Sequence, residues 1–185
     1  MRFKISPPQH GLIRALKSIS AQDKGVVAVE FALILPFLLL ILMGVIELSH
    51  GLQAKRKLLN AVQTASDLIS QQTDITSTDL DSIYLAAHLT MNPLNTTGMT
   101  IGVASVRFDD ATGTPTLDWA DSSNGGTVVD PLIKADGRGE AGASIVIVTG
   151  HYTYRPLVRL IVPVDFTMTE TSYVRPRKVS YVLKY

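Results

Sequence analysis

The chain has 185 residues, a formal net charge of +1 and no cysteine. That length suits one ordinary domain and an additional segment, and the nearly neutral charge argues against a nucleic-acid-binding domain, which typically carries a basic face. Without cysteine there is neither a disulfide nor a thiolate metal site. A domain outside the cytoplasm would therefore have to be stabilised by its apolar core.

Residues 1–24 form a basic leader. They contain one acidic residue, Asp23, and five basic ones: Arg2, Lys4, Arg14, Lys17 and Lys24. Basic residues close to a membrane span are retained in the cytoplasm. Three more basic residues stand at positions 55–57, beyond the apolar run that follows the leader. The bias of five to three predicts a cytoplasmic N-terminus.

The apolar run from Val26 to Ile46 is predicted to cross a membrane. It contains one ionisable residue, Glu30, and one proline, Pro36. A helix of these 21 residues is about 31 Å long, which matches the hydrocarbon core of a bilayer. The alternative is a buried core helix. From Phe31 onward, however, the run is apolar on every face, and a chain of this size could hardly surround it.

Helical periodicity continues beyond the run, so we expect one helix from about Val26 to about Gln72. Its stripe is formed by Leu48, Leu52, Leu59, Val62 and Ile69, at spacings of three, four and seven. Such a stalk needs a neighbour, either the chain's own domain or another subunit. A short amphipathic helix is expected next, from an N-cap at Ser77-Thr78 to Asn92-Pro93. Its apolar residues are Leu80, Ile83, Tyr84 and Ala87.

The last part of the chain has the composition of β-strands, rich in Val, Ile, Thr and Tyr. The predicted strands are Thr100–Phe108, Ala143–Tyr154, Val164–Val174 and Lys178–Tyr185. Residues 164–169 alternate between apolar and polar, so that strand should have one dry face. Residues 109–115 and 121–126 are turn-rich loops. Residues 73–185 are therefore predicted to form an α+β domain with a small, mostly antiparallel sheet.

The most informative motif is Gly25-Val-Val-Ala-Val-Glu30-Phe31, which follows a lysine and opens the apolar run. A charged carboxylate within a membrane costs about 2.5–3.5 kcal/mol, so it needs a role or a partner. Cleavage after Gly25 would give Val26 a cationic amine. That amine lies about 6 Å along the helix axis from Glu30, so a neighbouring subunit's amine is the better partner. Alternatively, Glu30 snorkels to the interface of an ordinary anchor.

Glycine, four residues, glutamate and phenylalanine ahead of an apolar helix resemble the prepilin-peptidase site of type IV pilin-like proteins. The longer sequence from Gly25 to Pro36, followed by Gly44-Val-Ile-Glu-Leu48, is similar to TadE-like subunits of the tight adherence (Flp/Tad) pilus system. This match covers about 45 residues. A weaker pattern near the end consists of Tyr152-Thr-Tyr154-Arg-Pro156 and Arg175-Pro-Arg177.

The resemblance implies a minor pilin or pseudopilin, not an enzyme, with no cofactor and no metal. It implies cleavage between Gly25 and Val26, a part for Glu30 and Phe31 in processing and assembly, and a helix kink at Pro36. The implied partners are a prepilin peptidase, the major pilin, other minor pilins and the inner-membrane assembly platform, with neither nucleic acid nor a small-molecule substrate. The chain would be a single-pass inner-membrane protein with a periplasmic C-terminal domain, and would act in pilus biogenesis and adhesion.

Other candidate sites are weaker. Residues 130–140 are acidic and glycine-rich but lack the spacing of a calcium loop. The four histidines, at positions 10, 50, 88 and 151, show no metal-ligand spacing. The basic residues of the C-terminal third suit a solvated face of the sheet or, less well, a docking patch. They are Arg155, Arg159, Arg175, Arg177, Lys178 and Lys184. A signal-anchored periplasmic binding or sensor domain remains the alternative function. A membrane-anchored hydrolase would need a nucleophile–base pair, which no motif supplies.

Overall fold

The computed structural model describes residues 11–185, and within residues 11–24 it describes the helix without the side chains. Arg2, Lys4 and His10 lie outside the described residues, and so do the side chains of the other basic leader residues. The chain divides into two compact units between Ile46 and Glu47.

One helix, α1 (Gly11–Ser70), begins in the leader and includes Pro36. It begins before the expected Val26 because residues 12–24 contain good helix formers and no proline. Between Val26 and Ile46 the large apolar side chains are 39–67% exposed. The stretch from Gly25 is long and apolar enough to cross a membrane. This exposure contradicts the alternative of a buried core helix.

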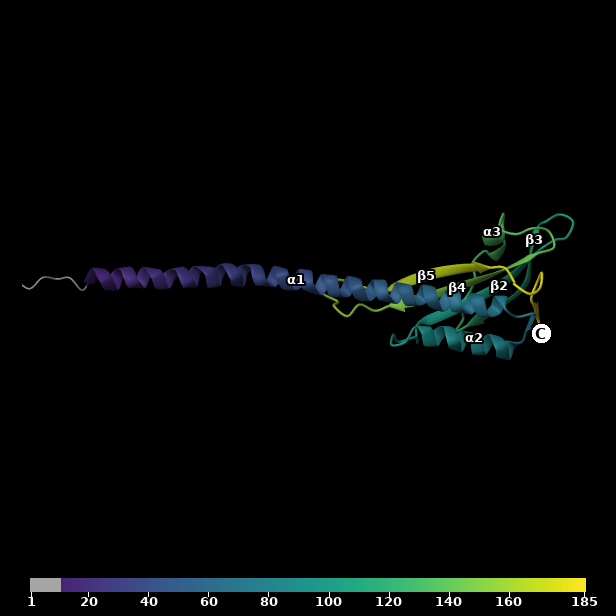
Figure 1. The fold of residues 1–185 in the computed structure, drawn as a ribbon, viewed down its shortest axis with the longest axis horizontal. Coiled ribbons are helices and arrows are strands. Elements are labelled where there is room, and N and C mark those ends of the chain that lie inside the picture. The colour runs from purple at the N-terminus through teal and green to yellow at the C-terminus, as the bar shows by residue number, and fades with distance from the viewer. Residues whose placement is uncertain (1–10) are drawn as a thin grey trace, which may run out of the picture. The chain divides into compact units, whose positions relative to one another are not determined.

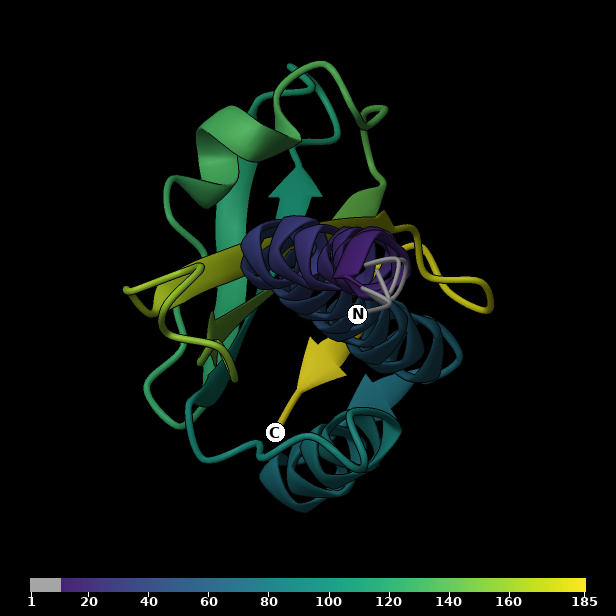
Figure 2. The ribbon, with the colours of Figure 1, turned by 90° about the vertical axis from the view of Figure 1, so that its left-hand side faces the viewer.

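The second unit contains a four-stranded antiparallel sheet of order β3-β2-β4-β5. Its strands are β2 (Met99–Phe108), β3 (Pro115–Ser123), β4 (Ser144–Tyr154) and β5 (Phe166–Val174). Two short strands, β1 (Asp74–Ile75) and β6 (Leu183–Lys184), pair in parallel. The helices are α2 (Ser77–Thr90) and α3 (Pro131–Ala135). The outer half of α1, α2 and the sheet lie side by side (Figures 1 and 2), and the predicted α+β class is confirmed.

The core of this unit lies between the sheet and the two long helices. From α1 it contains Ala54, Leu58, Ala61, Val62, Ala65 and Ile69. The predicted stripe is therefore partly wrong: Val62 and Ile69 are buried, whereas Leu48, Leu52 and Leu59 are exposed. The buried face uses alanines, which allow the sheet to approach closely. A Cβ added to Gly150 of β4 would lie 2.5 Å from Cγ2 of Val62, so this glycine also permits the close approach.

The opposite face of the sheet is covered in part by a smaller cluster. Val106, Phe108, Ile145 and Ile147 pack there against Ala135 of α3. Farther along β4 and β5 the face is polar, with threonine and histidine side chains paired across the two strands. These pairs are Thr149 with Thr171, His151 with Thr169 and Thr153 with Thr167. Helix α3 and strand β3 were not predicted.

Three boundaries differ from the expectations. The N-cap of α2 is Thr76, which forms a capping box with Asp79. Strand β5 begins at Phe166, so Val164 lies in the preceding loop and is 63% exposed. Of the three apolar residues predicted to form the dry face of this strand, only Met168 packs against the core. Of the expected strand Lys178–Tyr185, Leu183 and Lys184 form β6.

Candidate functional site

The Gly25–Phe31 motif lies within α1, on a part of the helix whose side chains are exposed. A Cβ at Gly25 would have no neighbour within 4 Å, and Val26 and Phe31 are 57% and 58% exposed. Glu30 is also exposed, and within the described residues it has no hydrogen bond or ion pair. The motif is thus accessible to a peptidase or to a neighbouring subunit. Pro36 stands five residues beyond Phe31 in the same helix.

A second site, which the sequence did not predict, is built around Glu47, the residue directly after the apolar run. Glu47 is 3% exposed. Its Oε1 accepts a hydrogen bond from the Tyr154 hydroxyl at 2.7 Å, and its Oε2 accepts one from the backbone N–H of Val158 at 2.8 Å. A buried carboxylate is tolerated where such donors replace water. We refer to Glu47, Tyr154 and the Val158 amide as the Glu47 site.

The Glu47 site gives the Tyr-x-Tyr-x-Pro pattern a structural explanation. Tyr152, Tyr154 and Pro156 are buried, and Tyr154 fixes the end of β4 to α1. Burial, followed by the hydrogen bond to Glu47 and its negative charge, raises the pKa of Tyr154 to about 12. The hydroxyl therefore remains protonated, and able to donate, throughout the physiological range.

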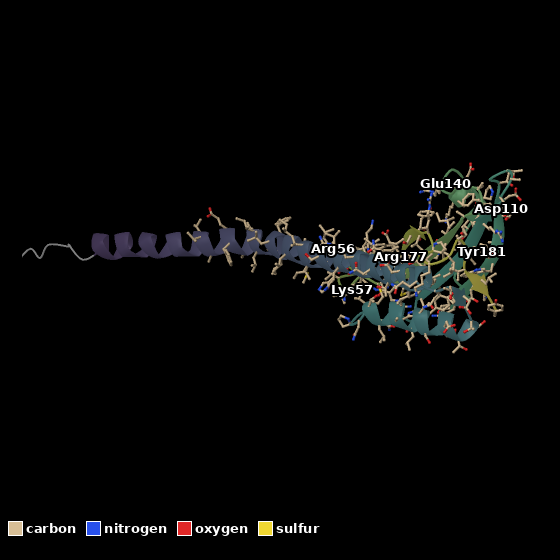
Figure 3. All side chains as sticks on the ribbon, turned by 45° about the vertical axis from the view of Figure 1, so that its right-hand side comes forward. Arg56, Lys57, Asp110, Glu140, Arg177 and Tyr181 are labelled. Atoms are coloured by element: carbon tan, nitrogen blue, oxygen red, sulfur yellow. The ribbon has the colours of Figure 1, made fainter. Side chains whose placement is uncertain are left out.

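The Arg175-Pro-Arg177 pattern also attaches the C-terminal segment to the rest of its unit. The guanidinium of Arg177 lies 2.7 Å from Asp67 of α1, and its backbone N–H donates to the carbonyl of Ser70 at 2.8 Å (Figure 3). Arg175 donates to the carbonyl of Arg138 at 2.9 Å. Both arginine side chains are more than half exposed. They are therefore solvated, as expected, and also paired within the unit.

The final residues are fixed to strand β3 of the sheet. The indole N–H of Trp119 donates to the carbonyl of Val182 at 2.8 Å. Lys184 forms an ion pair with Asp121, which also accepts a hydrogen bond from Tyr84 at 3.0 Å. Burial alone would raise the pKa of Asp121, but the hydrogen bonds from Lys184 and Tyr84 lower it overall. Burial and the nearby Asp121 charge raise the pKa of Tyr84.

A cavity of about 400 Å³ lies next to the Glu47 site. It is lined by His50, by residues 93–95 after α2, and by Tyr152–Arg155 and Leu157. Lys57, labelled in Figure 3, donates to the carbonyl of Asn92 at 2.6 Å, and Asn92 directly precedes the lining residue Pro93. The cavity combines an apolar wall with histidine and arginine side chains.

The three histidines that the structure describes do not converge on a metal site. His50 lines the cavity, His88 is 3.4 Å from the hydroxyl of Ser123, and His151 is 2.9 Å from that of Thr169. Burial lowers the pKa of His88. Within residues 25–185, no three side chains of His, Asp or Glu are placed to hold a metal ion.

Comparison with known families bears on the N-terminal half of the chain. The model of a family described as TadE-like protein matches residues 25–67. Residues 25–67 are therefore similar to this family. The match begins at Gly25 and includes the apolar run, Glu47 and much of the buried face of α1. No curated protein and no solved structure matches the chain.

Proposed function

We propose that this chain is a minor pilin or pseudopilin of the Tad pilus system, and that a prepilin peptidase cuts it between Gly25 and Val26. The observation that carries the proposal is the position of the Gly25–Phe31 motif. It opens the exposed apolar run of α1, and its Gly25 is the first residue of the TadE-like match.

The cleavage step requires the helix to open locally. Gly25 lies inside α1, whereas a peptidase draws the backbone around the scissile bond into its cleft. Glycine is about 1 kcal/mol less favourable than alanine within a helix, and it has no Cβ to obstruct a close approach. Gly25 therefore makes local opening of α1 at the scissile bond easier than alanine would. Cleavage there leaves Val26 as the new N-terminus.

The assembly step uses Glu30. After cleavage, the carboxylate of Glu30 pairs with the Val26 amine of a neighbouring subunit, because within one helix the two groups are about 6 Å apart along the axis. In a medium of low dielectric constant, each charge offsets the desolvation cost of the other. The exposed ring of Phe31 adds an apolar contact to the same neighbour. Pro36 would bend the helix beyond the motif.

The chain lies in the bacterial inner membrane with its N-terminus in the cytoplasm and residues 73–185 in the periplasm. Its partners are the peptidase, the major pilin, other minor pilins and the assembly platform, and its task is pilus biogenesis and adhesion. The five-to-three bias of basic residues supports this orientation. A reporter fused after Tyr185 should be active in the periplasm, and activity in the cytoplasm would overturn this topology.

Two matched glycine substitutions test the proposal. Gly25→Val should leave uncut precursor, since the valine side chain obstructs the close approach of the backbone at the scissile bond. Gly44→Val is the control, because Gly44 lies in the same helix and has equally open space around it. Immunoblots of cells that contain the peptidase should show the precursor for Gly25→Val and the mature form for Gly44→Val. Mature Gly25→Val protein would refute cleavage at this position.

The cavity beside the Glu47 site supports a second candidate, a signal-anchored periplasmic binding or sensor domain. Its volume of about 400 Å³ lies within the range of small-molecule sites. In this case the spacing from Gly25 to Glu30 would be accidental and the chain would keep its leader. The Gly25→Val and Gly44→Val proteins would then migrate identically, at the size of the full chain.

A further inference from the structure

The loop between β4 and β5, residues 155–165, is unusually apolar for an exposed segment. Leu157, Leu160 and Val164 are 69%, 78% and 63% exposed. Phe166, the first residue of β5, is 41% exposed beside the ring of Tyr154. Several large exposed apolar side chains within one short loop are a candidate for contact with a partner or a membrane.

The Glu47 site holds one end of this loop close to the residue at which the outer unit begins. The Val158 amide binds Glu47 at 2.8 Å, and Glu47 directly follows the last residue of the apolar run. Because Glu47 and the loop belong to one compact unit, this attachment does not depend on the angle between the two units. Leu157 is next to Val158 in the chain, and Leu160 is two residues away, a reach of at most about 7 Å. The headgroup region of one leaflet is about 5–7 Å thick.

The charges of the loop also suit a lipid surface. Arg155 and Arg159 share a single carboxylate, that of Asp165, at 3.7 Å and 3.1 Å. The two guanidinium groups are 78% and 64% exposed, so the loop carries an excess positive charge. Arginine forms hydrogen bonds with phosphate readily, and basic residues are attracted to anionic lipids.

We propose that the β4–β5 loop is a second membrane contact, in which Leu157, Leu160 and Val164 enter the outer leaflet of the membrane that α1 spans. Arg155 and Arg159 bind phosphate groups of the lipid at the same level. This inference rests on the membrane span of the proposed function and concerns a different part of the chain.

Because the chain contains no cysteine, a single fluorophore or spin label can be attached at any exposed position. The full chain is reconstituted into vesicles of phosphatidylcholine and phosphatidylglycerol, with the label on Leu160→Cys. Leu38→Cys, in the middle of the apolar run, is the lipid reference. Ile133→Cys is the water reference, because Ile133 is an exposed aliphatic residue of α3, at 76%. Quenching by doxyl-labelled lipids and by iodide then reports whether each label is in lipid or in water.

The label at position 160 should be quenched by doxyl lipids severalfold more than the label at position 133, and protected from iodide. If the label at position 160 is quenched by iodide and by doxyl lipids to the same extent as the label at position 133, while the label at position 38 lies in lipid, the loop contact is overturned and the span remains. Failure of position 38 to reach lipid would instead refute the span, and the loop contact with it. Protection that disappears as the lipid-to-protein ratio rises would show that a second copy covers the loop, which also overturns the proposal.

The arginines are tested separately in the same preparation. Replacement of both, Arg155→Gln with Arg159→Gln, should reduce lipid quenching at position 160 in the mixed vesicles and change it little in phosphatidylcholine alone. An equal effect in both vesicles, or none in either, would contradict recognition of anionic lipid by these side chains.

Discussion

Replacement of Tyr154 by phenylalanine removes a single hydroxyl from the centre of the Glu47 site and creates almost no cavity. The hydroxyl donates to Oε1 of Glu47 at 2.7 Å, and the two residues are 5% and 3% exposed. A hydrogen bond to a charged group contributes about 1.5–3 kcal/mol, and a buried acceptor without a donor loses about that much. Tyr154→Phe should therefore lower the free energy of unfolding of the outer unit by about 1.5–3 kcal/mol.

The control is Tyr173→Phe. Tyr173 is 37% exposed, and its ring, which the substitution keeps, lies 4.3 Å from the guanidinium of Arg138. Tyr173→Phe should lower the free energy of unfolding of the outer unit by no more than about 0.5 kcal/mol. Urea unfolding of the full chain in detergent provides the measurement. The single tryptophan, Trp119, reports on the outer unit because its indole N–H binds the carbonyl of Val182.

A double-mutant cycle separates the hydrogen bond from other effects of the substitution. In Glu47→Gln the side chain presents one carbonyl oxygen and one NH₂ group to two donors, the hydroxyl of Tyr154 and the amide of Val158, so one donor is left unpaired. Combining it with Tyr154→Phe should cost less than the sum of the single changes, by about 1 kcal/mol or more. Additive losses, or a Tyr154→Phe loss as small as that of Tyr173→Phe, would refute the description of the Glu47 site.

Three further predictions concern other parts of the chain. Glu30→Leu should be cut normally but should not join the assembly, whereas Glu30→Asp should be partly active; a normal pilus count for Glu30→Leu would show that Glu30 is a snorkelling anchor residue. Gly150→Ala should destabilise the outer unit by about 1–3 kcal/mol through overpacking, because its Cβ would lie 2.5 Å from Cγ2 of Val62; an unchanged urea midpoint would contradict this packing. Lys184→Met should lower stability at neutral pH. The folded pKa of Asp121 is below its ordinary value of 3.8. The ion pair therefore stabilises the fold fully above pH 3.8, and this stabilisation is lost as the pH falls through the folded pKa. The difference in stability between wild type and Lys184→Met should thus become smaller in acid. A difference independent of pH would contradict the ion pair.

Features determined by neighbouring residues were predictable from the sequence. The run from Val26 to Ile46 is recognised by its length and composition alone. Strands β2 and β4 are rich in β-branched residues and were predicted to within one residue at each end. The resemblance to TadE-like proteins also rests on a continuous stretch of sequence, and it is confirmed over residues 25–67.

Features that depend on distant residues were not predictable. Glu47 and Tyr154 are 107 residues apart, and an acid that directly follows an apolar run is normally expected to face water. The buried face of α1 was misjudged because Ala54, Ala61 and Ala65 give a weaker hydrophobic signal than the exposed Leu48 and Leu52. Helical periodicity identifies a stripe but does not say which stripe the sheet will cover.

Strand β3 was missed for a related reason. It is an edge strand, paired on one side with β2, and it contains Asp118 and Asp121. Polar residues are common in such strands because one side and one face remain in water. Its pairing with β2, rather than its own composition, makes it a strand.

The most direct test of the central proposal is the N-terminus of the wild-type protein. The chain would be purified from its native membrane and its intact mass and N-terminal sequence determined. Cleavage by a prepilin peptidase predicts a chain that begins at Val26, with the leader of residues 1–25 removed. A chain that still begins at Met1, in cells that contain an active peptidase, would contradict the pseudopilin proposal and leave an uncut membrane-anchored domain.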